Sequence, residues 1–119
     1  MFKLIKIENG RMNVPEPEYH VAGTALKAGQ AVSIEGGKLE VNVAAPTHIT
    51  LASAKANDAK VPCARIEPAQ VYEVSVKTTA PTSVGDKVAI ATDGVSVNAD
   101  SSGIATVVSL GDKITVRFN

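Results

Sequence analysis

The residues of this chain best suited to metal binding or nucleophilic chemistry are its two histidines and its single cysteine. His20 and His48 are far apart and share neither the HxH nor the HExxH spacing of metal sites. We interpret His48, which falls in an expected strand, as a surface or partner-facing residue. Cys63 has no neighbouring base in sequence and follows Val-Pro in an apparent strand interior. It is therefore expected to be a buried, unreactive thiol.

Acidic residues offer two further kinds of site. Glu16, Glu18 and His20 alternate along an extended segment, so their side chains can face one side and converge on a metal ion. The alternative, which we favour, is a solvated acidic arm without metal. The aspartates lie at expected turns, without the spacing of a calcium loop: Asp58, Asp86, Asp93, Asp100 and Asp112. We therefore expect no metal, no cofactor and no enzymatic activity.

A Gly-Asp-Lys triplet suggests ligand chemistry of another kind. Gly85–Val88 lacks the GxxxxGK[ST] spacing of a phosphate loop, and an expected strand follows it where such a loop needs a helix. Small duplicated lipoyl- or biotin-carrier domains also contain Gly-Asp turns, with a modified lysine in a hairpin. Lys38 is the one residue placed for that role, but its neighbours Gly37 and Leu39 do not fit. A carrier domain is therefore the least favoured alternative.

The same triplet belongs to a short sequence pattern, or phrase, that recurs along the chain. In each copy a turn residue precedes alternating apolar residues. The copies are Gly29–Ile34, Gly85–Ile90 and Gly111–Val116, with a looser copy at Ala69–Val74. Apolar residues two apart face one side of a strand, the pattern of a half-buried strand. With the other alternating segments, this predicts about eight to ten short antiparallel strands in an all-β barrel or sandwich.

Two of these phrases also match each other over a longer stretch. A shift of 56 residues aligns turn and core positions without a gap, placing Gly29, Val32, Ile34, Val41 and Asn42 on Gly85, Val88, Ile90, Val97 and Asn98. Either an internal hairpin duplication or two hairpins that obey the same turn rules explains the match.

With 119 residues, the chain has the size of one domain. We expect an N-terminal strand over residues 2–7 and a Pro-containing arm over 9–20, followed by a single β-barrel domain over 21–119. Residues 53–60 are expected to form one helical turn or a long loop.

Composition excludes several kinds of partner. Lys plus Arg and Asp plus Glu both number 12, which leaves no basic excess for nucleic acid. Aromatic residues make up 3% of the chain and tryptophan is absent, which argues against base-stacking and sugar-stacking surfaces. The sequence has no apolar run of about 18 residues, so we expect no membrane partner.

The order of the parts resembles the small capsid decoration, or head cement, proteins of tailed bacteriophages. The likeness is carried by the Gly29 turn and strand, His48–Leu51, Val61–Ile66 with Val71–Val76, Gly85–Val88 with Asp93-Gly94, and Ile104–Phe118. The resemblance implies a structural virion protein on the outer capsid surface, assembled in the host cytoplasm. It implies that the protein binds the major capsid protein, stabilises contacts between capsid subunits, and contacts other copies of itself as a trimer or as neighbours. Another phage or cell-surface module of tail, baseplate or fibre is the alternative.

For such a role, we interpret residues 1–20 as a docking arm, because extended, Pro-locked segments lose little entropy on binding. The partner-binding residues under this hypothesis are Phe2, Leu4, Val14, Pro15, Pro17 and Tyr19. In the alternative, Phe2, Leu4 and Ile7 form a strand of the core.

Overall fold

The computed structural model describes residues 1–7, 16–68 and 70–119, and for Lys6 and Ile7 it describes the backbone only. This part of the chain contains eleven strands and no helix, which confirms the all-β prediction. The strands are β1 (Lys3–Ile7), β2 (Glu18–Ala22), β3 (Ala31–Glu35), β4 (Lys38–Val41), β5 (His48–Thr50), β6 (Val61–Arg65), β7 (Gln70–Val76), β8 (Lys87–Ile90), β9 (Ser96–Ala99), β10 (Ala105–Ser109) and β11 (Ile114–Phe118). No helix among the described residues could cross a membrane.

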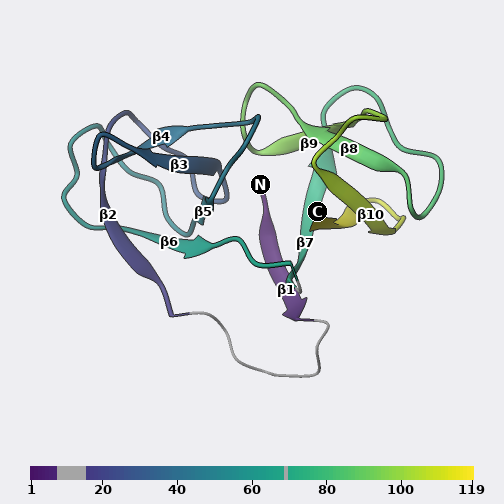
Figure 1. The fold of residues 1–119 in the computed structure, drawn as a ribbon, viewed down its shortest axis with the longest axis horizontal. Coiled ribbons are helices and arrows are strands. Elements are labelled where there is room, and N and C mark those ends of the chain that lie inside the picture. The colour runs from purple at the N-terminus through teal and green to yellow at the C-terminus, as the bar shows by residue number, and fades with distance from the viewer. Residues whose placement is uncertain (8–15, 69) are drawn as a thin grey trace.

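The strands form two small barrels that lie side by side (Figure 1). In the first barrel the strands follow one another in the closed order β2-β4-β3-β5-β6. In the second the order is β7-β9-β8-β10-β11, closed by the pairing of β11 with β7. β1 adds to the second barrel through antiparallel pairing with β7. Where the sequence suggested one barrel over residues 21–119, the chain thus closes twice.

Both barrels have the same topology. In each, the first strand runs parallel to the third, and every other neighbouring pair is antiparallel. The registers also agree, because Ala22 lies opposite Leu39 in the first barrel as Val76 lies opposite Val97 in the second. The chain therefore contains one five-stranded arrangement twice.

The register corrects the alignment suggested by the 56-residue shift. Ile34 pairs with Leu39 in the first barrel, and Ile90 pairs with Val97 in the second. The turn between these partners is longer in the second barrel, so Val97 is equivalent to Leu39, although the ungapped shift places it on Val41. The shift is valid for β3 and β8, and it fails beyond the hairpin turn.

The segment over residues 53–60 forms a loop, so the helical alternative is wrong. Leu26 forms an isolated antiparallel bridge with Ala54, and Asn57 has a φ of 71°. This left-handed residue ends any helical progression, and the loop backbone bonds to β2 instead, with Asn57 N donating to Ala22 O at 2.8 Å.

An aromatic cluster fills the second barrel and includes the N-terminal segment. Phe2 packs against Tyr72 and Phe118, with ring centroids 6.3 and 5.6 Å away. Phe2 is buried, and Leu4 packs partly buried against the same core. This arrangement matches the core-strand alternative for Phe2 and Leu4, because the pairing of β1 with β7 turns both side chains inward.

Several contacts hold the barrels against each other. Ala31 and Ile49 of the first barrel belong to the same hydrophobic core as the aromatic cluster of the second. Ala31 N donates to Gly94 O at 2.8 Å, and the buried Gln30 donates from Nε2 to Asp93 O at 2.9 Å. These bonds fix the β8–β9 turn against β3.

Candidate functional site

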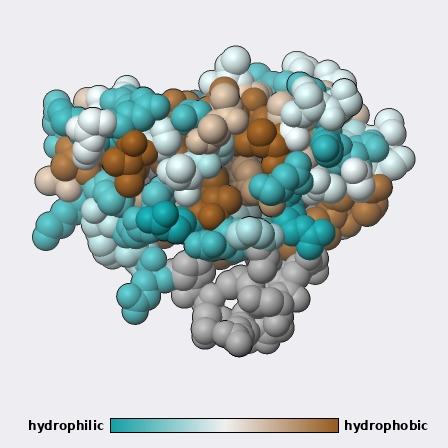
Figure 2. Space-filling model, in the orientation of Figure 1, coloured by the Kyte–Doolittle hydropathy of each residue, from teal (hydrophilic) through white to brown (hydrophobic). Residues whose placement is uncertain are grey.

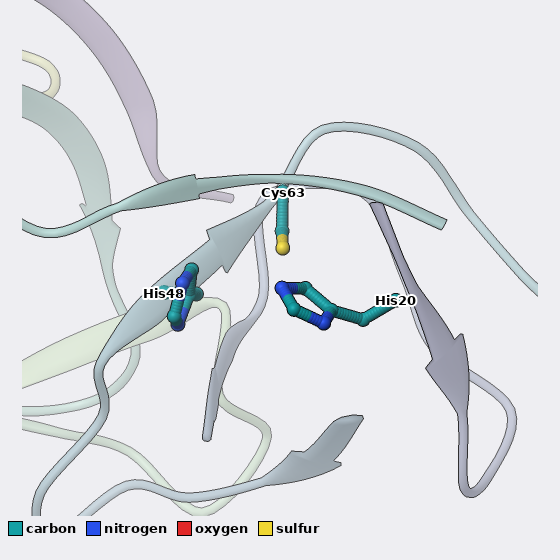
Figure 3. A group of neighbouring side chains, drawn as sticks. All are labelled: His20, His48 and Cys63. Carbon is teal, nitrogen blue, oxygen red and sulfur yellow. The ribbon is translucent and has the colours of Figure 1, made fainter. Parts of the chain in front are cut away.

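Three potential ligand side chains meet inside the first barrel. His20 projects from β2, His48 from β5 and Cys63 from β6, and Figure 3 shows these side chains projecting from different strands toward one another. One ligand atom of each lies within 4.8 Å of the others. Because β6 pairs with both β2 and β5, barrel closure brings together residues that are distant in sequence.

The prediction that His48 faces the surface or a partner is wrong, since its side chain is 2% exposed. The physical reason is that both faces of β5 are buried. His48 and Thr50 face the interior of the first barrel, while Ile49 packs into the core shared with the second. A strand covered on both sides has no solvent face to which a histidine could point.

Glu18 connects the cluster electrostatically. Its Oε1 lies 3.1 Å from Nε2 of His20 and 3.1 Å from Nε2 of His48, and its Oε2 accepts a hydrogen bond from Arg65 Nε at 3.1 Å. The hydrogen bond from His20 is the main cause that lowers the pKa of Glu18 to about 2, with His48 and Arg65 adding to it against the effect of burial. The carboxylate is therefore ionised and accepts hydrogen bonds from both rings.

The other ring nitrogen of His48 is also held in place. Its Nδ1 lies 2.8 Å from Thr47 Oγ1, a hydroxyl that can donate or accept. The two imidazole rings lie edge to face, with centroids 5.7 Å apart. Hydrogen bonds at both nitrogens thus orient the His48 ring toward Glu18 and His20.

Cys63 is fully buried and free, as predicted from its strand position. Burial raises the pKa of its thiol to about 11, and the nearby Glu18 charge adds to this effect. The thiol donates a weak hydrogen bond to Glu18 O, with Sγ and O 3.6 Å apart. With only these partners the group stays protonated, so the arrangement does not support a nucleophilic role.

The second barrel is apolar at all of these positions. Following the strand pairings around each barrel relates Glu18, His20, His48, Cys63 and Arg65 to Tyr72, Val74, Ala105, Val116 and Phe118. Every one of these equivalents is buried in the hydrophobic core. The fold itself therefore does not require polar residues there.

The structure modifies the metal hypothesis drawn from Glu16, Glu18 and His20. Glu18 and His20 do meet, whereas Glu16 is exposed. The group of neighbouring ligand atoms contains His20 but neither glutamate. His48 and Cys63 complete the group, and sequence reasoning missed both. The signal available in the sequence was the alternation along each expected strand, which tells which residues share a side. His48 and Cys63 come to lie beside each other only when the strands pair in the closed barrel.

The structure shows what surrounds the Gly-Asp-Lys triplet and Lys38, the lysine considered for a carrier role. Asp86 Oδ2 accepts hydrogen bonds from the backbone N of Thr82 and Ser83, both at 3.0 Å, so the triplet stabilises a turn. Lys38 is exposed at the start of β4 and pairs across the strands with Glu35.

The docking residues proposed from sequence are found in different surroundings. Phe2 and Leu4 belong to the core, whereas Pro17 and Tyr19 are exposed. Val14 and Pro15 lie outside the described residues. Only the exposed pair therefore presents described side chains to a partner.

Tyr19 belongs to an apolar row on the outer face of the first barrel. It lies opposite Pro62 in the pairing of β2 with β6, and on the other side of β6 the backbone N of Leu51 donates to Pro62 O at 2.9 Å. Tyr19 is 59% exposed and Leu51 is 51% exposed. We call Tyr19, Pro62 and Leu51 the outer row. It lies on the opposite side of the same strands from His20, Thr50 and Cys63.

No protein-family model and no curated protein matches this chain.

Proposed function

We propose that the protein is a capsid decoration protein of a tailed bacteriophage, which binds the outer surface of the assembled head and stabilises contacts between major capsid subunits. The observation that carries the proposal is the outer row of the first barrel. Two exposed apolar side chains, Tyr19 and Leu51, with the half-buried Pro62 between them, form a contact surface on the barrel. This proposal gives Tyr19 the partner-binding role expected from the sequence and leaves Phe2 and Leu4 to the fold.

The shape of the molecule supports this role. Two barrels with a shared core form a body with extents of 40 × 32 × 22 Å, long enough to contact more than one subunit of a shell. Between the barrels lies a groove of about 560 Å³, lined by both: Ala44, Ala45, Pro46, Thr47, Arg65, Ile66 and Glu67 from the first, and Ile104, Phe118 and Asn119 from the second. Such a groove can receive a protruding loop of a capsid subunit.

Surface chemistry supports assembly of many copies. The formal net charge is zero, so neighbouring copies on a shell do not repel one another through net charge. On the face seen in Figure 2, hydrophobic residues form separate groups among hydrophilic ones, which suits modest contacts repeated over a shell. Each contact can then be weak while the assembled layer is stable.

Sedimentation with capsid shells tests the proposal. The purified protein is mixed with shells assembled from the major capsid protein of the same phage, and the pellet is measured over a range of protein concentrations. We expect saturable binding at a fixed ratio to capsid subunits. The double substitution Tyr19→Ser with Leu51→Ser should weaken the apparent affinity by at least about tenfold, since loss of central apolar anchors costs more than about 1 kcal/mol.

The second barrel offers a matched control. Val84 and Leu110 are 63% and 46% exposed, so Val84→Ser with Leu110→Ser removes a similar amount of exposed apolar surface elsewhere. This control should bind shells like the unmodified protein. Absence of binding by the unmodified protein would contradict the decoration role, and equal losses in both double variants would contradict the use of the outer row.

A further inference from the structure

We propose that the first barrel binds one zinc ion through His20, His48 and Cys63. This site is independent of the decoration role, because its ligands face the barrel interior and the outer row faces away from it. The ligand atoms come from three neighbouring strands in the order β2, β6 and β5. A bound ion would therefore cross-link the inner sides of the strands that carry the outer row.

The geometry fits a tetrahedral ion after small side-chain movements. Zinc bonds of about 2.0–2.3 Å place tetrahedral ligand atoms roughly 3.3–3.6 Å apart. The three ligand atoms here already lie within 4.8 Å of one another. Rotations about the side-chain torsions can close the remaining gap of about 1 Å without moving the strands.

The chemistry of the donors favours zinc over alkaline-earth ions. Imidazole nitrogen and thiolate sulfur are the donors most often found around zinc, whereas Ca²⁺ and Mg²⁺ require oxygen. Cys63 is a thiol in the metal-free protein, so binding of the ion would release its proton to solvent. Glu18 borders the same space, with Oε1 3.1 Å from Nε2 of each histidine, and adds a negative charge beside a cation. Its other oxygen stays bonded to Arg65, which holds the carboxylate in place.

The surroundings of the ligands also fit a metal site. Zinc-bound histidines commonly use their second nitrogen to bond a neighbouring group, which orients the ring. Thr47 Oγ1 is already 2.8 Å from Nδ1 of His48. It would accept that hydrogen bond once the ring proton moves from Nε2, which faces Glu18, to Nδ1 and leaves Nε2 free for the ion. Glu18 and His20 are partly exposed, so an ion can reach the ligands from that end of the barrel.

The second barrel supplies an independent argument. At the positions of the three ligands it has Val74, Ala105 and Val116, all buried. Placing polar side chains where the second barrel has valine and alanine costs free energy unless the polar groups gain partners. In the metal-free protein those partners are Glu18 for both histidines and Glu18 O for the thiol. A bound metal ion would replace these separate contacts with one partner shared by all three side chains.

Metal titration of the full chain, free of affinity tags and kept reduced, tests the proposal. We expect one equivalent of Zn²⁺ to bind and to raise the melting temperature, because the ion binds only the folded state. One equivalent of Co²⁺ should give a thiolate-to-cobalt charge-transfer absorption. The chain has a single cysteine, so this absorption can arise only from Cys63.

Two variants remove a proposed ligand each, and a third serves as their control. Cys63→Ser should abolish the charge-transfer absorption, and His20→Asn should weaken Zn²⁺ binding by at least about 100-fold, beyond the usual effect of losing a supporting residue. Glu73→Gln, which removes a carboxylate from the first strand of the other barrel, should bind Zn²⁺ like the unmodified protein. Circular dichroism without metal checks that each variant folds.

Two results would overturn the proposal. One is that the folded, reduced protein shows no stoichiometric Zn²⁺ binding. The other is that folded His20→Asn or folded Cys63→Ser binds Zn²⁺ as tightly as the unmodified chain. His20 lies partly exposed, so its variant tests the site even where a change at the buried Cys63 prevents folding.

Discussion

The two barrels share one topology and differ most at one end of their interiors. In the second barrel Tyr72 and Phe118 pack edge to face, with centroids 5.6 Å apart, and Phe2 covers them. In the first barrel the equivalent positions hold Glu18 and Arg65, which form an ion pair that is partly exposed to solvent. The same backbone thus accepts either an apolar core or a polar cluster at this end.

The two ends contribute differently: the aromatic end of the second barrel stabilises the fold, whereas the polar end of the first barrel contributes little to stability. Three packed aromatic rings remove a large apolar area from water, and most of the stabilisation at this end of the second barrel comes from that burial. A partly exposed ion pair contributes little to stability. The first barrel therefore has less apolar packing at this end and carries instead the polar cluster that we propose as a zinc site.

The largest expected difference between the barrels comes from the equivalent residues Phe118 and Arg65. Phe118→Ala should lower the free energy of unfolding by about 3–5 kcal/mol, because it leaves a cavity beside Phe2 and Tyr72. Arg65→Ala should lower it by about 0–1 kcal/mol, because Arg65 is more than half exposed and its ion pair with Glu18 is partly solvated. Urea unfolding of both variants measures the difference, and equal losses would contradict the contrast between the two ends.

A second pair of variants compares the N-terminal strand with β2. Phe2→Ala should lower the free energy of unfolding by about 3 kcal/mol, as expected for a buried aromatic residue. Tyr19→Ala should change it by about 0.5 kcal/mol or less, since Tyr19 is largely exposed. Thermal unfolding checks both values. A stable Phe2→Ala variant that no longer binds capsid shells would restore the docking role for Phe2.

The hairpin turns of the two barrels give a smaller contrast. Gly94 has a φ of 73°, and an added Cβ would lie 2.9 Å from Gln30 Cγ, at the junction between the barrels. Gly36 has a φ of 57° but meets no atom within 4 Å. Both changes to alanine cost about 1 kcal/mol for the left-handed backbone. Gly94→Ala should cost more by the additional contact, as chemical denaturation of the two variants can show.

The smallest expected effect concerns Asp86, a turn residue directly before β8. Its equivalent directly before β3 is Gln30, which carries no charge. Backbone hydrogen bonds from Ser83 and Thr82 lower the pKa of Asp86 from its ordinary value of 3.8. A lowered folded-state pKa stabilises the turn above pH 3.8, and this stabilisation is lost as the pH falls toward the folded value. Stability measured over acidic pH should therefore depend slightly less on pH in Asp86→Asn, and an unchanged pH dependence would contradict the role of this carboxylate.

The sequence predicted the strands well because alternation and turn residues are local signals. The phrases beginning at Gly29 and Gly85 do form strands β3 and β8, and the strand expected over residues 2–7 is β1. Closure into two barrels is not local, since it depends on the pairings of β2 with β6 and of β7 with β11. Those registers are set by packing between segments that no short window contains.

The site could be predicted only in part for the same reason. Glu18 and His20 alternate on one strand, so their shared side was visible in the sequence. His48 and Cys63 come from two other strands, and their approach to His20 depends on barrel closure. The burial of His48 could not be inferred either, because it depends on which face of β5 points into the closed first barrel while Ile49 packs against the second.

X-ray absorption spectroscopy at the zinc edge, on protein loaded with one equivalent of Zn²⁺, tests most directly the claim that the polar end of the first barrel is a metal site. The account predicts one sulfur ligand at about 2.3 Å and imidazole nitrogens at about 2.0 Å, with scattering from two rings. A spectrum with no sulfur ligand, or without imidazole scattering, would contradict it.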